Sequence, residues 1–243
     1  SPFQDSKDFM FKRIPKEAAI QTALVEIVAK LYERRTNFQV LSPRHVGDHV
    51  GVTVLNQVIR ERINPKSPGA PEARIGSWMM REGDRIMVVK NNYDLNVFNG
   101  DTGKVQRINT GDNKVLVKIH GPPAQQVELT FKEVGMFLRL AYCVTVHKMQ
   151  GLEADVIVIP WVKSFRRQLQ RNLLYTAVTR AREKVIMLGH REAFITAVRN
   201  NREDARNTLL VERLINMMEN PDQRQEAIAG IVQLDDDDDD IFA

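Results

Sequence analysis

The spacing of apolar residues changes twice along this chain of 243 residues, and the changes limit the folds that it can adopt. Up to residue 65 the pattern is helix, buried strand, helix. Residues 84–131 then alternate as short strands between turns, and from residue 138 continuous apolar runs return. Continuous runs indicate parallel strands covered on both faces, whereas short, regularly spaced strands indicate a small antiparallel barrel. The sequence therefore predicts an α/β domain interrupted by an inserted β-barrel.

The patterns divide the chain into four segments. The α/β domain is expected at 1–75 and 138–219, the barrel at 76–137, and an acidic, disordered tail at 220–243. In the α/β domain we expect a helix at 15–34, a strand at 38–41, a helix from 52 to the stop at Asn64–Pro65, strands at 138–146, 155–160 and 184–188, and helices at 164–181, 191–199 and 205–218. In the barrel we expect strands at 84–89, 102–108, 114–119 and 126–131.

Composition excludes several classes of protein. No stretch approaches the roughly eighteen consecutive apolar residues of a membrane span, and the N-terminus lacks the layout of a secretory signal. The single cysteine, Cys143, cannot form an internal disulfide or hold a metal alone, which favours a reducing compartment. We therefore expect a cytoplasmic protein without a membrane partner and without a metal site of its own.

The net charge of +4 is unevenly distributed along the chain. The 35 Lys and Arg residues stand against 31 Asp and Glu, but six of these acids form the run Asp235–Asp240, and the rest of the chain carries +10. A basic body favours an anionic partner such as nucleic acid, although a generally solvated surface explains the charge equally well. The acidic run could occupy a basic groove, recruit a basic partner, or simply aid solubility as a solvated tail.

Polar residues are dense between Thr145 and Glu153, where the chain leaves one expected strand and approaches the next. Ligands of open α/β sheets bind beyond the carboxyl ends of the strands, so we expect the loop at that edge. Its imidazole, lysine, amide and carboxylate groups, with a glycine that permits close backbone approach, favour a phosphate- or nucleotide-facing loop over a merely polar surface loop.

The segment Leu173–Arg182 reads as a mostly apolar helix that is closed by Arg180 and Arg182. Arginine binds phosphates through two parallel hydrogen bonds and stabilises charge during phosphoryl transfer. Taken alone, the two arginines are better explained by a favourable interaction with the negative end of the helix dipole.

Taken together and in this order, the segments resemble the C-terminal motor half of superfamily 1 helicases, most closely the RecD-like branch, which moves 5′ to 3′. Residues 145–153 are similar to the family's fifth motif, 175–181 to its sixth and 39–65 to its fourth. Gly83–Arg85, Asn91–Tyr93 and Val97–Gly100 resemble its SH3-like insertion. The resemblance implies that residues 1–75 and 138–219 form a RecA-like parallel-sheet domain, the second motor domain, around a small SH3-like antiparallel β-barrel.

The resemblance also implies a nucleotide site. Arg180 would reach the γ-phosphate of ATP across the cleft between two motor domains, and Arg44 would be a second basic contact to the phosphates. These two arginines are the candidate catalytic residues. Gln150, Gly151 and Glu153 would bind the nucleotide as well, with Glu153 near the ribose.

A single-stranded DNA contact is implied for four further residues: Thr145, His147, Lys148 and Ser42. For His147 the alternative is a hydrogen-bonded loop histidine. In the barrel, Tyr93 and Phe98 could stack a base, dock a protein partner or fill the interior, and we expect Phe98 in the core.

The chain contains no P-loop, because Gly103–Lys104 is followed by Val105, and no Asp–Glu pair follows a strand to hold Mg²⁺. Phosphoryl transfer needs a phosphate cradle, a lysine and a metal carboxylate. The resemblance therefore implies part of an ATP-dependent DNA helicase that binds ATP with Mg²⁺ only together with the N-terminal motor domain of the same protein. This chain alone is not expected to hydrolyse ATP. The alternative is a non-catalytic helicase-like module that binds single-stranded DNA, or a protein partner through the barrel or acidic tail.

Overall fold

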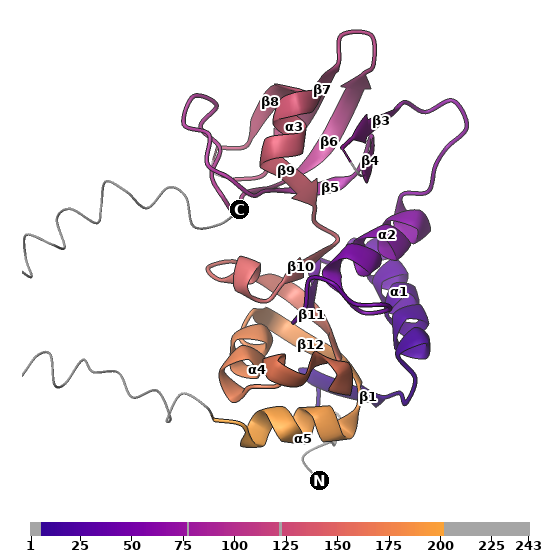
Figure 1. The fold of residues 1–243 in the computed structure, drawn as a ribbon, viewed down its shortest axis with the longest axis vertical. Coiled ribbons are helices and arrows are strands. Elements are labelled where there is room, and N and C mark those ends of the chain that lie inside the picture. Colours follow the sequence, from indigo (N-terminus) through magenta and orange to yellow (C-terminus); the bar gives the residue numbers. More distant parts are fainter. Residues whose placement is uncertain (1–5, 77, 122, 202–243) are drawn as a thin grey trace, which may run out of the picture. The chain divides into compact units, whose positions relative to one another are not determined.

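A computed structural model describes residues 6–76, 78–121 and 123–201 of the chain, and it confirms the expected fold class (Figure 1). The α/β part is built on one parallel sheet. Its strands lie in the order β1 (Phe9–Arg13), β12 (Ala181–Gly189), β11 (Ala154–Trp161), β2 (Phe38–Ser42) and β10 (Cys143–Thr145). Every neighbouring pair is parallel, so all five strands share one carboxyl edge and one amino edge.

Helices cover both faces of the parallel sheet (Figure 1). One face carries α1 (Glu17–Glu33) and α2 (Val52–Ile63); the other carries α4 (Arg171–Val178) and α5 (Arg191–Arg199). Two short 3₁₀ segments, η1 (His147–Met149) and η2 (Lys163–Gln168), connect strands to the following elements. Within the described residues, no helix is both long and apolar enough to cross a membrane.

The periodic segments were predicted correctly because their apolar faces are buried. In α1 the side chains of Ile20, Leu24 and Val28 are fully buried, at the spacing of one helical face. The strand β2 is buried along its whole length, as its continuous apolar run predicts for a strand covered on both faces. Packing of these side chains fixes the position of β2, and with it the strand end that carries the candidate residue Ser42.

The inserted part forms a second, antiparallel sheet with its own core. Its strands lie in the order β8 (Gln125–Thr130), β7 (Lys114–Ile119), β6 (Thr102–Asn109), β5 (Arg85–Val88) and β9 (Leu138–Leu140). A hairpin of β3 (Glu72–Ile75) and β4 (Trp78–Arg81) and the helix α3 (Phe131–Phe137) accompany it. This core includes Ala73, Ile75 and Leu138, which lie outside the limits 76 and 137. The four domain limits stay a prediction.

Two expected elements are wrong in detail. The run 138–146 is not one strand: β9 pairs with β5 in the antiparallel sheet, whereas β10 pairs with β2 in the parallel sheet. An apolar run shows burial but not the sheet in which a strand is buried. The helix expected at 164–181 is shorter, because η2 precedes it and α4 ends at Val178. The helix expected at 205–218 and the acidic tail lie outside the described residues.

Asn56 on α2 holds the edge strand β10 in place. Its side-chain Oδ1 accepts a hydrogen bond from the Cys143 N–H at 3.0 Å, and its Nδ2 donates to the Cys143 carbonyl at 2.8 Å. The amide thus satisfies the backbone groups that an additional strand would otherwise satisfy. This contact fixes the backbone two residues before Thr145.

Asp84 joins the antiparallel sheet to the α/β part. Its fully buried carboxylate accepts hydrogen bonds from the Tyr142 hydroxyl at 2.8 Å and from Asn64 Nδ2 at 2.9 Å, and it lies 3.9 Å from the Arg60 guanidinium. Burial raises the pKa of Asp84, although these donors act in the opposite direction.

Candidate functional site

The loop between β10 and β11 runs from one edge of the parallel sheet to the other. Thr145 ends β10 at the carboxyl edge, whereas Ala154 begins β11 at the amino edge. The expectation that Thr145 to Glu153 all lie at the carboxyl edge is therefore wrong. A parallel connection must return along the length of the sheet before the next strand begins. The candidate residues consequently form two groups at opposite strand ends.

At the carboxyl edge, Thr145 lies beside Ser42 in the register of β10 and β2. Thr145 is half-buried, and its hydroxyl accepts a hydrogen bond from the Lys148 N–H at 3.4 Å. Ser42 is fully buried, and its hydroxyl donates to the Val50 carbonyl at 2.7 Å. Ser42 therefore shapes the loop before α2, and its contact with DNA stays a prediction.

His147 and Lys148 are exposed in the turn that follows Thr145. Although the Lys148 side chain reaches solvent, partial desolvation by the surrounding protein and the positive charge of Arg139 lower its pKa. Two cations held near each other in this way favour an anion between them.

A cavity of about 500 Å³ opens beside this turn and contains residues that the sequence did not single out. Thr145 and Lys148 line it together with His45 and Thr53 near the start of α2. The antiparallel part contributes one aromatic, one basic and several apolar side chains to its wall. These are Trp78, Met79, Met87, Val89, Arg139 and Leu140. Trp78 begins the strand β4, whose four residues are too few to show a clear period, so periodicity could not have identified it.

At the amino edge, the backbone brings the segments of Glu153 and Arg180 together. The Ala154 N–H donates to the Arg180 carbonyl at 3.1 Å, where β11 and β12 begin side by side. Glu153 Oε2 accepts a hydrogen bond from Arg182 Nε at 3.0 Å, with both side chains about half exposed. An exposed pair of this kind contributes little to stability, so it is free to rearrange around a ligand.

Arg180 lies in the turn between α4 and β12, and Arg182 lies within β12, so neither belongs to the preceding helix. Arg180 is half-buried. Its Nε donates to the Thr176 carbonyl and its Nη2 to the Thr179 hydroxyl, both at 3.2 Å. No carboxylate of the described residues forms an ion pair with it. The guanidinium is thus held in one orientation without a counter-charge, which suits an anionic ligand.

Arg44 and Arg180 do not lie together. Arg44 is exposed and follows the carboxyl end of β2, whereas Arg180 precedes the amino end of β12. Gln150 and Gly151 lie on the connection between the two edges, both exposed. Gly151 has a φ of +80°, a conformation that glycine adopts without strain.

Phe98 is not in the core, contrary to the expectation. It is 41% exposed, and its ring lies edge-on against Tyr93, 6.1 Å between centroids, with Tyr93 76% exposed. The two rings therefore form an exposed aromatic pair on the connection between β5 and β6.

Two family descriptions match the chain over these regions. The SH3 domain of ATP-dependent RecD-like DNA helicases matches residues 55–119, and the UvrD-like helicase C-terminal domain matches residues 140–188. The chain carries the SH3 and C-terminal domains of a RecD-like helicase. The second match includes the residues from Thr145 to Arg180, whereas Ser42 and Arg44 precede both matches.

Relatives of this RecD-like chain include the ATP-dependent RecD2 DNA helicase of Deinococcus radiodurans, 36% identical over 176 residues that are 72% of this chain and 23% of that protein. The RecBCD enzyme subunit RecD of Mycobacterium tuberculosis is 32% identical over 136 residues, 51% of this chain and 23% of that protein. The chain thus spans about a quarter of the length of these relatives. Among solved structures, Bacteroides Pif1 bound to single-stranded DNA covers 70% of this chain and 47% of its own at 15% identity, with a TM-score of 0.44.

Proposed function

We propose that this chain is the second motor domain of an ATP-dependent DNA helicase. Its parallel sheet would bind the nucleotide at the amino edge, called the nucleotide edge below. It would bind single-stranded DNA at the carboxyl edge, called the DNA edge. The separation of the site residues into two groups at opposite strand ends carries the proposal. Glu153 and Arg180 lie at the amino edge, and Thr145 and Lys148 at the carboxyl edge. A motion of the domain that is driven by the nucleotide at one edge would therefore change the contacts with a DNA strand at the other edge.

At the nucleotide edge, Arg180 would stabilise the charge that develops on the transferring phosphoryl group. Glu153 would exchange its pairing with Arg182 for a nucleotide hydroxyl. Mg²⁺ and the phosphate cradle would come with the N-terminal motor domain of the same protein, because this chain has no P-loop. Gln150 and Gly151 would connect the nucleotide edge to the DNA edge.

At the DNA edge, Thr145, His147 and Lys148 would bind the phosphates of a single strand. The neighbouring cavity of about 500 Å³ has room for a base, and Trp78 offers a ring on which it can stack. We assign Arg44 to this edge instead of the nucleotide, because it follows the carboxyl end of β2. Movement from 5′ to 3′ is proposed on the resemblance to the RecD-like branch.

A protein partner is a second candidate function of the SH3-like part, favoured by the exposed Tyr93–Phe98 pair. Exposed aromatic side chains contribute strongly to protein interfaces. The acidic run Asp235–Asp240 is the other candidate contact. The buried, unpaired Cys143 agrees with action in the cytoplasm.

The proposal is tested with this chain and a fluorescent oligo-dT in a salt titration. Each phosphate contact to a single strand contributes about 0.7 to the slope of log K against log salt. Lys148→Gln is expected to reduce the slope by about that amount, whereas Lys132→Gln, which removes an exposed lysine from α3, is expected to leave it unchanged. Equal slopes for the two variants would contradict the DNA edge. The same chain is expected to show no ATP turnover.

A further inference from the structure

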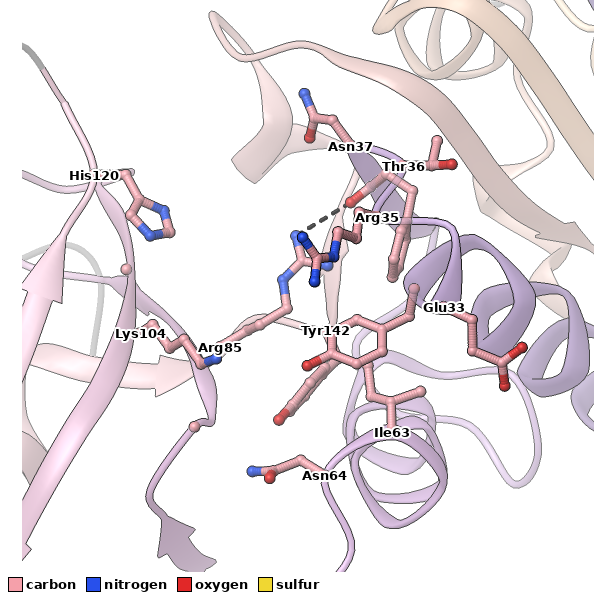
Figure 2. Close-up of a pocket in the computed structure, with 14 residues that line it drawn as sticks. Glu33, Arg35, Thr36, Asn37, Ile63, Asn64, Arg85, Lys104, His120 and Tyr142 are labelled. Atoms are coloured by element: carbon pink, nitrogen blue, oxygen red, sulfur yellow. Dashed lines mark hydrogen bonds between the residues drawn. The ribbon is translucent and has the colours of Figure 1, made fainter.

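A second cavity, of about 590 Å³, lies at the opposite end of β2 from the DNA edge. The end of α1, the first residues of β2 and the strands β5 and β6 line it (Figure 2). Four basic side chains line its wall. Arg85, Lys104 and His120 come from the antiparallel part, and Arg35 comes from the turn before β2. We call these four residues the basic pocket.

The strand register extends the basic pocket into a row of cations. Arg85 on β5 lies directly opposite Lys104 on β6, and Lys104 lies directly opposite Lys118 on β7. Directly opposed residues share one face of a sheet, and neighbouring strands are about 4.8 Å apart. Like charges in this position destabilise a sheet. A row of three cations across three strands is therefore better explained by an extended anionic ligand than by folding.

Arg85 anchors this row at the wall of the cavity. Its guanidinium carbon lies 4.9 Å from the centre of the Phe38 ring, and its Nη2 donates to the Phe38 carbonyl at 3.1 Å. Burial lowers the pKa of Arg85, and no carboxylate of the described residues forms an ion pair with it. Arg85 is half-buried, and a partly desolvated cation without a counter-charge favours an anionic ligand.

Of the other cavity groups, Arg35 adds to the positive potential, whereas His120 has a lowered pKa and contributes no charge near neutral pH. Arg35 and Lys104 are exposed and form no ion pair within the described part of the chain. Burial lowers the pKa of His120, and the charges of Arg85, Lys118 and Lys104 lower it further. Among the described lining residues Glu33 is the one carboxylate.

We propose that the basic pocket and Lys118 bind the phosphodiester backbone of a nucleic-acid strand, at a site separate from the DNA edge. A row of cations that crosses three strands matches successive phosphates better than one isolated phosphate. The site goes beyond the proposed motor function, because it needs neither Arg180 nor a nucleotide. Through this site the SH3-like part would bind the nucleic-acid strand independently of the DNA edge.

The test uses the double variant K104Q/K118Q in the same oligo-dT salt titration. Both lysines are exposed, and removal of opposed like charges is expected to leave the urea midpoint unchanged or to raise it. The slope of log K against log salt is expected to fall by up to about 1.4, two single-strand contacts of about 0.7 each. The matched control is R107Q/K132Q, which removes two exposed cations from β6 and α3 outside the cavity. Equal slopes for the two double variants would overturn the proposal.

Further measurements distinguish this site from the DNA edge and from a site for a smaller anion. If the sites are separate, Lys148→Gln and K104Q/K118Q are expected to act additively, and loss of one effect alone identifies which site fails. Inorganic phosphate or ATP that competes as well as unlabelled oligo-dT, at equal phosphate concentration, would overturn the assignment to a nucleic-acid strand. So would a chain lacking residues 235–243 in which K104Q/K118Q no longer weakens binding, because the aspartate run would then be the occupant.

Discussion

Replacement of Asn56 by alanine is expected to destabilise the fold and to loosen the strand that carries Thr145. The Asn56 amide satisfies both the N–H and the carbonyl of Cys143, which is fully buried. A buried polar group left without a partner costs about 1–3 kcal/mol. We therefore expect Asn56→Ala to lower the free energy of unfolding by about 2–5 kcal/mol, measured by urea denaturation with an unchanged m-value. The exposed neighbour supplies the control, since Gln57→Ala should change stability by less than about 0.5 kcal/mol.

Thiol labelling shows whether this loss is local. Cys143 is the single cysteine of the chain and is fully buried, so a thiol reagent reacts only when β10 opens. Each 1.4 kcal/mol of lost local stability is expected to speed labelling about tenfold in the variant. A change in unfolding free energy below about 0.5 kcal/mol, or an unchanged labelling rate, would refute the role given to Asn56.

Two further perturbations test the packing and the junction. Gly189→Ala would place a Cβ in collision with the Trp161 carbonyl oxygen. Thermal denaturation should therefore show a loss of at least about 1–3 kcal/mol in the free energy of unfolding. The control is Gly111→Ala, which should be tolerated because its Cβ would lie 3.4 Å from its nearest neighbour. Burial raises the pKa of Asp84, so the unfolded chain loses this proton at lower pH than the folded protein, and stability should fall as pH rises from 3.8 towards the raised value. Urea midpoints measured against pH should show this fall for the wild type relative to Asp84→Asn; parallel curves would contradict it.

The fold was predictable wherever burial follows the period of an element. In α1 and β2, side-chain burial repeats at helical spacing or along the whole run, and both elements were predicted within two residues of their observed ends. β1 was missed because five residues, two of them basic, form a short edge strand with little alternation. The division of 138–146 between two sheets depends on pairing partners far away in sequence, which periodicity does not show.

The sequence singled out candidate site residues, whose roles stay a prediction, but it did not show their arrangement. Motif order identified Glu153 and Arg180, and the structure brings their segments together through Ala154. The sequence does not show that the loop after Thr145 crosses from the carboxyl edge to the amino edge, because that distance depends on the length of the strands in the sheet. The row of Arg85, Lys104 and Lys118 depends on strand register, and those positions are separated by many residues in the chain. Register emerges only when the strands pair.

The most direct test of the proposed function is the ATP turnover of the complete protein with Arg180 replaced by alanine. Arginines that stabilise a transferring phosphoryl group are worth about 10³ to 10⁵ in rate. We expect Arg180→Ala to reduce DNA-stimulated turnover by about that factor while oligo-dT binding is retained. The control is Arg199→Ala, which removes an exposed arginine from the last turn of α5. A near-normal turnover in Arg180→Ala would contradict the assignment of the amino edge to the nucleotide.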